Sequence, residues 1–261
     1  MPHTQQSASE TVSEAVYWRD YYELSEPGYE WNNGYLEEKP VSDYQTYLVY
    51  RWFTALLEFY LQTCSVARFT GLEMGFRLAL PNKTTIRKPD LGVVLDSNPV
   101  PLQLEDTSYH GIFDICVEAL SDSEKSEIER DTVVKKAEYA AAGVKEYFIL
   151  HDHDKHLAFY RLSQHQTYLP IMPQNGVIHS EVLPGFQFRM KDLFIRPGVV
   201  DMLQDSVYQP FVLPTWQRER AQLQHEINLR DQAEKRAEDE ARQRRQAEAE
   251  IARLQALLEN K

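Results

Sequence analysis

The sequence predicts an α/β domain, in which helices flank a mixed sheet, followed by one long C-terminal helix. Between residues 44 and 151 the hydrophobic periodicity follows the order helix, strand, strand, strand, helix, strand, which favours a sheet with helices packed on it. Residues 215–260 contain no glycine and no proline and are rich in Ala, Gln, Glu, Arg and Leu. That composition is typical of a continuous helix.

The first predicted helix, residues 44–62, is too long and too uniformly apolar to be a strand. Its apolar residues recur at spacings of three and four, as a buried helix requires. They include Leu48, Trp52, Ala55, Leu56 and Phe59. Ser42 or Asp43 supplies its N-cap. We expect the aromatic residues of this helix to form core rather than a platform for stacking nucleobases. They include Tyr44, Tyr47, Tyr50, Trp52, Phe53 and Phe59.

Strands are predicted on both sides of this helix. Residues 29–38 contain Asn33-Gly34, the commonest signal for a two-residue hairpin turn. Residues 66–80 indicate one or two strands with a turn near Gly71. The other predicted strands are 91–95, 112–117, 145–152, 156–162 and 167–172.

A second helix is expected over residues 126–142, and it contains two adjacent lysines. Lys135 shares one face with Ile128 and Tyr139, which normally face a sheet. Lys136 points about 100° away from that face. We therefore predict that Lys135 is the lysine directed toward the sheet.

Four parts of the chain are expected: a flexible N-terminus (1–16), the α/β domain (17–196), a linker (197–214) and a helical tail (215–261). The tail has a thin apolar stripe, mostly alanine and interrupted by Arg244, so heptads fit it loosely. A helix of this length gains too little from propensity alone. The composition therefore favours a coiled coil, with itself or with a partner, over a lone solvated helix.

The charge distribution limits the class of partner. The formal net charge is −12, and the ten basic and ten acidic residues from Trp216 onward cancel, so the excess lies in the first 215 residues. Such a surface gains little from general attraction to phosphates. A nucleic-acid substrate would therefore need a local basic patch, a metal ion or a partner protein.

Compartment is indicated by the cysteines and by the hydropathy. Cys64 and Cys116 stand in apolar surroundings and are predicted to be reduced thiols. No apolar run has the length of a membrane span, and the polar N-terminus lacks the apolar core of a signal peptide. We therefore expect a cytoplasmic protein without membrane association.

Three residues carry the strongest indication of chemistry. Asp90 stands directly before the predicted strand 91–95. Glu118 directly follows the predicted strand 112–117. Two carboxylates at the edges of neighbouring strands can bind one hard divalent cation, which polarises a phosphoryl oxygen and activates water. A lysine directed at the same point, Lys135, can stabilise the developing charge. This set is the minimum equipment for phosphodiester hydrolysis.

Each of these residues also has an interpretation without catalysis. Asp90 taken alone is typical of a solvated turn, and Glu118 could form a buried salt bridge to Lys135 of purely structural meaning. The run of alternating His and Asp at 151–156 suggests a metal cluster, but it lies between two strands and shows no remote further ligand. We expect ordinary turn residues there.

These residues, in this order, resemble the PD-(D/E)XK nuclease superfamily and, more narrowly, the restriction-endonuclease-like family called Uma-two. The matching stretches span residues 17–196, and the block from Glu118 to Phe148 is the specific one. They are 29–34, 88–90, 117–121, 130–131 with Lys135, 139–148, 183–186 and 192–194.

The resemblance implies an α-β-β-β-α-β restriction-endonuclease-like core and a Mg²⁺- or Mn²⁺-dependent endonuclease that hydrolyses DNA by metal-activated water. It implies that Asp90 and Glu118 are metal ligands, helped by the Ala119 carbonyl. The lysine usual two residues after the glutamate is Leu120 here, so Lys135 takes its place from the helix. Glu30 matches an acidic family position and is a weaker candidate.

Two hypotheses follow. In the first, the protein is this endonuclease, and it forms a homodimer because two-fold-related sites suit the cutting of two strands. In the second, it is a catalytically inactive nuclease fold that oligomerises or binds partners through residues 215–261. The negative charge and the absence of a basic stripe favour the second.

Overall fold

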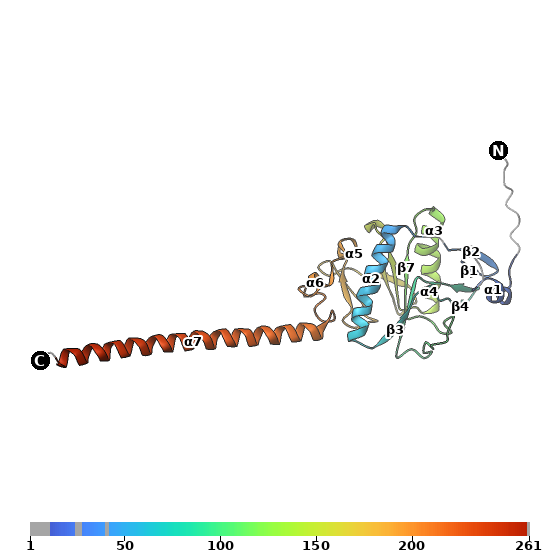
Figure 1. The fold of residues 1–261 in the computed structure, drawn as a ribbon. Coiled ribbons are helices and arrows are strands. Elements are labelled where there is room, and N and C mark those ends of the chain that lie inside the picture. Colours follow the sequence, from blue (N-terminus) through green and yellow to red (C-terminus); the bar gives the residue numbers. More distant parts are fainter. Residues whose placement is uncertain (1–10, 24–27, 40–41, 260–261) are drawn as a thin grey trace. The chain divides into compact units, whose positions relative to one another are not determined.

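The computed structural model describes residues 11–23, 28–39 and 42–259, the last twelve by their backbone only. The chain forms two compact units, Met1–Val212 and Leu213–Lys261. The second consists of helix α7 (Pro214–Glu259), labelled in Figure 1. The predicted long C-terminal helix is confirmed.

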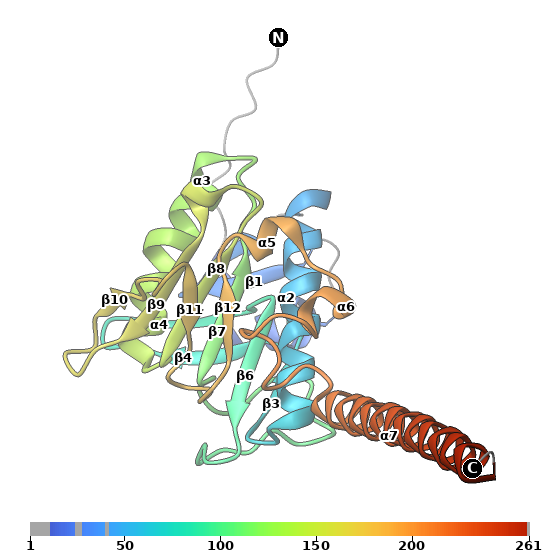
Figure 2. The ribbon, with the colours of Figure 1, turned by 90° about the vertical axis from the view of Figure 1, so that its left-hand side faces the viewer.

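A six-stranded mixed sheet forms the centre of the first unit (Figure 2), in the order β10-β9-β8-β7-β6-β3. Its strands are β3 (Ala67–Thr70), β6 (Leu91–Leu95), β7 (Ile115–Ala119), β8 (Glu146–Leu150), β9 (Ala158–Leu162) and β10 (Tyr168–Pro170). β7 and β8 are parallel, and the other pairs are antiparallel. The order of α2 (Tyr44–Thr63), β3, β6, β7, a helix and β8 confirms the predicted α/β class.

Two smaller antiparallel sheets accompany the main one, in the orders β2-β1-β5-β4 and β11-β12. Their strands are β1 (Tyr29–Asn32), β2 (Tyr35–Glu38), β4 (Phe76–Ala79), β5 (Thr84–Arg87), β11 (Val177–His179) and β12 (Gln187–Arg189). The predicted hairpin is present, with φ of 47° at Asn33 and 101° at Gly34. Segment 66–80 contributes β3 and β4 to different sheets. Strand β5 was not predicted, because four residues with two threonines show little periodicity.

Between β7 and β8 the chain forms a helix with an irregular centre. α3 (Lys125–Glu129) continues as a π-helical segment (Arg130–Lys135) and then as α4 (Lys136–Ala142). Gly143 ends it at φ 92°. Because this helical segment joins two parallel strands, it returns the chain across the sheet.

Short helices complete the described part of the chain. They are α1 (Glu14–Asp20), a 3₁₀ turn (Asp154–His156), α5 (Asp192–Ile195) and α6 (Val199–Met202). α1 begins within the N-terminal segment 1–16 that was predicted to be flexible. Residues 1–10 of that segment lie outside the described residues. No helix in the described ranges is long and apolar enough to cross a membrane.

The main sheet has a separate core on each face. α2 packs on one face, with Val117 and Phe148, while α4 packs on the other, with Cys116 and Tyr147 (Figure 2). Successive residues alternate between the faces because side chains along a strand have a period of two. Glu118 therefore shares the α4 face with Cys116, and Lys135 reaches that face from the helix.

The segment 197–214, which the sequence predicts as a linker, is largely packed against this core. Met202, Leu203, Val207, Tyr208, Phe211 and Val212 are buried in the cluster that contains α2. Tyr208 donates a hydrogen bond to Asp192 Oδ2 at 2.6 Å. Up to Val212 this segment is therefore part of the domain core and not a free linker. Both cysteines are free thiols, as predicted.

Gly92 on β6 provides a test of the packing. A Cβ there would lie 2.5–2.7 Å from the ring of Phe113, too close for any real contact. We expect Gly92→Ala to lower the free energy of unfolding in urea by about 1–3 kcal/mol. Gly198→Ala, where the nearest atom is 3.9 Å from the new Cβ, is the matched control. Equal costs for the two variants would contradict this packing.

Candidate active site

The register of β6 and β7 places Asp90 beside Glu118. Leu91 pairs with Val117 in this antiparallel pair, so the residue before β6 meets the residues that end β7. Asp90 Oδ2 accepts a hydrogen bond from the backbone N–H of Ala119 at 2.6 Å. The two carboxylates named by the sequence therefore lie at one edge of the sheet, as predicted.

Lys135 contacts Glu118 directly. Its Nζ lies 3.1 Å from Glu118 Oε2, and Tyr139 donates to Glu118 Oε1 at 2.8 Å. Lys135 is 1% exposed, whereas Lys136 lies over the ring of Tyr160. The choice of Lys135 over Lys136 as the inward lysine is thus correct in geometry.

Three carboxylates surround the Lys135 ammonium. Besides Glu118, Asp131 Oδ1 lies 3.2 Å and Glu30 Oε1 3.3 Å from Nζ. Glu30 is fully buried and also accepts from the backbone N–H of Lys88. Glu30, the weaker candidate from the sequence, is therefore a buried partner of the lysine.

Burial and neighbouring charges shift the pKa values of Glu118 and Glu30 in opposite directions. Burial raises the pKa of Glu118 to about 8, against the opposing effect of Lys135, with Asp131 and Asp90 adding to the rise. Burial also opposes ionisation of Glu30, but Lys135 and Arg87 hold its pKa below the ordinary value. Burial, together with these neighbouring carboxylates, therefore favours the protonated form of Glu118 near neutral pH.

Lys39 is the functional candidate that the sequence analysis missed. Its Nζ lies 3.0 Å from Asp90 Oδ1 and donates to the Lys88 carbonyl at 2.7 Å. Although burial opposes its charge, Asp90 and Glu118 raise the pKa of Lys39. No periodicity or motif identifies this residue, which follows β2 directly; only the pairing of the hairpin with β5 brings it to Asp90.

A cavity of about 740 Å³ opens beside Asp90. Asp90, Ala119, Lys39 and Ser42 line it on the side of the sheet edge. Glu118 and Lys135 do not line it and lie behind Asp90, 2% and 1% exposed. Asp90 and Lys39 are thus the charged groups of the set that a molecule in this cavity would meet.

The donor atoms at this edge fit a hard divalent cation. Asp90, Glu118 and the Ala119 carbonyl offer oxygen only, the ligand type that Mg²⁺ and Mn²⁺ prefer. Each carboxylate has one oxygen fixed by a neutral donor, Ala119 N–H or Tyr139 O–H, and the other beside a lysine. The Ala119 carbonyl itself accepts from Ser42 Oγ at 2.8 Å. The ammonium groups of Lys39 and Lys135 compensate the negative charge of these two carboxylates, and a bound divalent cation would compensate the same charge.

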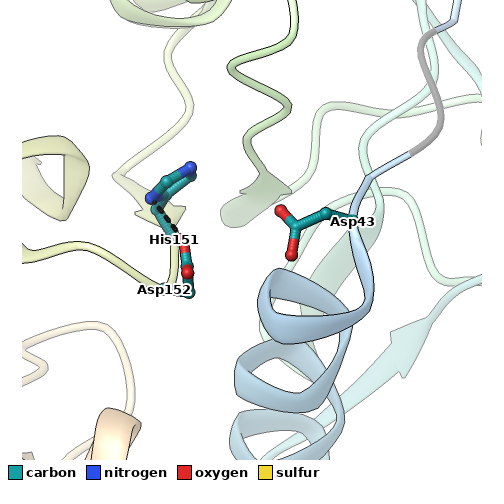
Figure 3. Close-up of side chains that lie close together, drawn as sticks. All are labelled: Asp43, His151 and Asp152. Atoms are coloured by element: carbon teal, nitrogen blue, oxygen red, sulfur yellow. Dashed lines mark ion pairs between the residues drawn. The ribbon is translucent and has the colours of Figure 1, made fainter.

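A second group of candidate metal ligands lies nearby. Asp43, the N-cap of α2, brings its carboxylate to His151 and Asp152 after β8 (Figure 3), and the three ligand atoms lie within 4.8 Å of one another. His151 is buried, and its Nε2 has no hydrogen-bond partner among the described residues, although Asp122 Oδ2 lies 3.5 Å away. Asp43 is thus the remote ligand that the sequence did not reveal, and this group could hold a metal ion.

A model of a known protein family matches most of the chain. Residues 18–191 match the model of the Uma2 family, described as "Putative restriction endonuclease". The chain belongs to the Uma2 family. This is the family that the sequence resembles, so that expectation is confirmed.

A solved structure supports the fold of this Uma2 member. It is the crystal structure of a "putative nuclease belonging to DUF820" from Anabaena variabilis ATCC 29413, with a TM-score of 0.56 and 15% sequence identity. The alignment covers 71% of this chain and 98% of that one. No curated protein matches the sequence.

Because Lys135 pairs with three buried carboxylates, its loss should destabilise this Uma2 protein much more than the loss of the neighbouring Lys136. Lys135→Met leaves Glu30, Glu118 and Asp131 buried without their ammonium, so we expect a loss of about 3–5 kcal/mol in the free energy of unfolding. Lys136→Met removes only a contact with Tyr160, worth about 0.5–1 kcal/mol. Urea unfolding measures both, and similar losses would show that Lys135 does not stabilise these carboxylates.

The raised pKa of Glu118 predicts a pH dependence of stability. In the folded chain its pKa is about 8, against an ordinary value of 4.5, so its contribution is complete below the lower value and is lost as pH rises toward the higher one. Glu118→Gln keeps a neutral side chain throughout. In EDTA, we expect this variant to gain stability relative to the wild type between about pH 5 and about pH 9.

The control for this comparison is Glu105→Gln, at an exposed position. Its stability difference from the wild type should stay constant over the same pH range. A constant difference for Glu118→Gln as well would mean that Glu118 ionises normally in the folded chain.

Proposed function

We propose that this protein is a divalent-metal-dependent endonuclease that hydrolyses phosphodiester bonds of DNA. The observation that carries the proposal is Asp90, which lines a cavity together with Lys39 and the Ala119 backbone and accepts a hydrogen bond from the Ala119 N–H, next to Glu118 in the chain. Membership of a family described as restriction endonucleases agrees with it.

Asp90, Glu118 and the Ala119 carbonyl would hold the cation, which is Mg²⁺ or Mn²⁺ in this proposal. When bound, it polarises a phosphoryl oxygen and lowers the pKa of a coordinated water. Tyr139 and the Ala119 N–H fix one oxygen of each carboxylate, and the other, which pairs with a lysine, is the one that a cation would contact. Deprotonated Glu118 is the binding form, so metal affinity rises with pH.

The two lysines have different roles. Lys135 is buried among carboxylates and does not line the cavity, so it acts as a positioning residue that orients Glu118. Lys39 lines the cavity and can neutralise charge on a phosphate there. This division differs from the sequence hypothesis, in which Lys135 itself meets the reacting group.

Cleavage of supercoiled plasmid and of single-stranded DNA with Mg²⁺ or Mn²⁺ tests the proposal. Asp90→Asn removes a metal ligand, so we expect a loss of activity of roughly 100-fold or more. Asp96→Asn, at the exposed other end of β6, is the matched control and should keep full activity. Equal cleavage by the two variants would exclude Asp90, and no cleavage by the wild type would contradict the function.

A second proposal concerns the tail. All described side chains of α7 except Pro214, Gln217 and Ala241 are exposed, Trp216, Leu223 and Ile227 among them, so an isolated helix of 46 residues gains little burial. We propose that it pairs as a coiled coil, with a second copy or with another protein, and that the protein is a homodimer located in the cytoplasm. This association would remain in a catalytically inactive protein.

Truncation after Val212 tests the tail, because the first unit is compact on its own. We expect light scattering to give twice the chain mass for the full protein and the single-chain mass for the truncated one. A dimeric truncated chain would instead assign dimerisation to the α/β domain. A monomeric full chain would exclude pairing of α7 with itself.

A further inference from the structure

Tyrosines form one wall of the cavity beside Asp90. Tyr44, Tyr47 and Tyr50 follow one another at a spacing of three along the start of α2 and all line the cavity. Tyr44 is 71% and Tyr47 47% exposed, so the expectation that they belong to the helix core is wrong. The cause is the helix face: Thr46 and Val49 in the same turns are buried, whereas Tyr44 and Tyr47 lie on the outward face, which continues with the exposed Glu58.

The two exposed rings form a continuous aromatic surface. The rings of Tyr44 and Tyr47 are stacked, with centroids 6.2 Å apart and planes 25° apart. Tyr50 joins this surface to the sheet edge, because its hydroxyl donates to the Asp90 carbonyl at 2.9 Å. A planar group lying on these rings would thus be adjacent to the carboxylate proposed to bind metal.

The turn between β3 and β4 contributes the other part of the lining. Leu72 and Glu73 line the cavity, and both have left-handed backbone conformations, with φ of 54° and 59°. Such conformations cost side-chain-bearing residues of order 1 kcal/mol or more each. Leu72 is fully exposed, so no packing of its side chain within the described chain offsets this cost.

Charge alone does not give this cavity affinity for DNA. Glu38, Glu73 and Asp90 line it against one cation, Lys39, in a domain that carries the whole negative excess of the chain. Stacking of nucleobases on aromatic rings contributes about 1–3 kcal/mol per base and does not depend on phosphate charge. Only an unpaired base can expose its face to a tyrosine, because duplex bases are stacked on one another.

We propose that this cavity binds an unpaired nucleobase next to the scissile phosphate, stacked on Tyr44 and Tyr47 with Leu72 against the strand. The substrate is then single-stranded DNA, or DNA with an unpaired nucleotide at the cleavage point. The volume of the cavity, about 740 Å³, lies within the range of about 300–1,000 Å³ that is usual for ligand sites. This inference rests on the proposed nuclease function and names its substrate class.

Fluorescence of 2-aminopurine tests the proposal without catalysis. The probe is a short oligonucleotide with one 2-aminopurine, single-stranded or annealed to its complement, titrated with the full-length protein in EDTA at fixed salt. We expect quenching and tight binding for the single strand and much weaker binding for the duplex. Equal affinity for the two would overturn the proposal.

Variants of the aromatic wall locate the base. The double variant Tyr44→Ala, Tyr47→Ala should weaken single-strand binding by about 5- to 100-fold, while Tyr44→Phe, Tyr47→Phe keeps both rings and should bind like the wild type. Tyr35→Ala is the matched control, since Tyr35 is 53% exposed on β2 and does not line the cavity. Unchanged affinity of the double alanine variant would place the base elsewhere.

Leu72 is tested in the same way. Leu72→Ser should weaken single-strand binding several-fold, because it removes the apolar contact with the strand, and Leu104→Ser, at a position 93% exposed outside the cavity, should not. Equal effects of the two changes would exclude Leu72 from the site.

Failure of this inference can be distinguished from failure of the nuclease proposal. Single-strand binding that depends on Tyr44 and Tyr47, without cleavage in Mg²⁺ or Mn²⁺, would support the base site and overturn the nuclease. Cleavage of duplex and single strand at equal rates, unaffected by the double alanine variant, would support the nuclease and overturn the base site.

Discussion

The buried ammonium of Lys135 connects the parts of the chain from which the site is built. It lies within 3.3 Å of Glu30 on β1, Glu118 on β7 and Asp131 in its own π-helical segment. Buried carboxylates are costly unless they are paired, so the hairpin, the main sheet and the crossover helix must meet at this cation. The edge where Glu118 and Asp90 lie is defined by that requirement.

The surroundings of Lys135 also determine the protonation of Glu118. Burial is the main cause that raises the pKa of Glu118 to about 8, and the negative charges of Asp131 and Asp90 add to the rise. A divalent cation bound there would compensate this charge and displace the proton. The π-helical segment has a part in this arrangement, because it ends at Lys135 and directs that residue to the sheet; irregular helical turns of this kind are frequent at functional sites.

The acidic surface, which argued against binding of DNA, is consistent with a site that recognises more than phosphates. Lys39 is the cation of the cavity lining, and the lining also includes three tyrosines and a fully exposed leucine. Affinity in such a cavity would come from bases and from a bound metal rather than from a general basic patch. The segment from Trp216 to Lys261 adds no net charge, because its basic and acidic residues cancel.

The sequence alone determined the α/β class, the order of elements in the main sheet, the long helix, and Asp90, Glu118 and Lys135 as candidates. These follow from short-range rules: the period of apolar residues, the Asn33-Gly34 turn, and one helix face that Lys135 shares with Tyr139. Only the tertiary structure decided which side chains meet. Lys39 meets Asp90, and Asp43 meets His151, across long stretches of chain. Tyr44 and Tyr47 are exposed because they lie on the face of α2 opposite to the buried Val49 and Phe53. Aromatic residues occur on both the buried and the exposed face of α2, so the pattern of apolar residues does not tell which face meets the sheet.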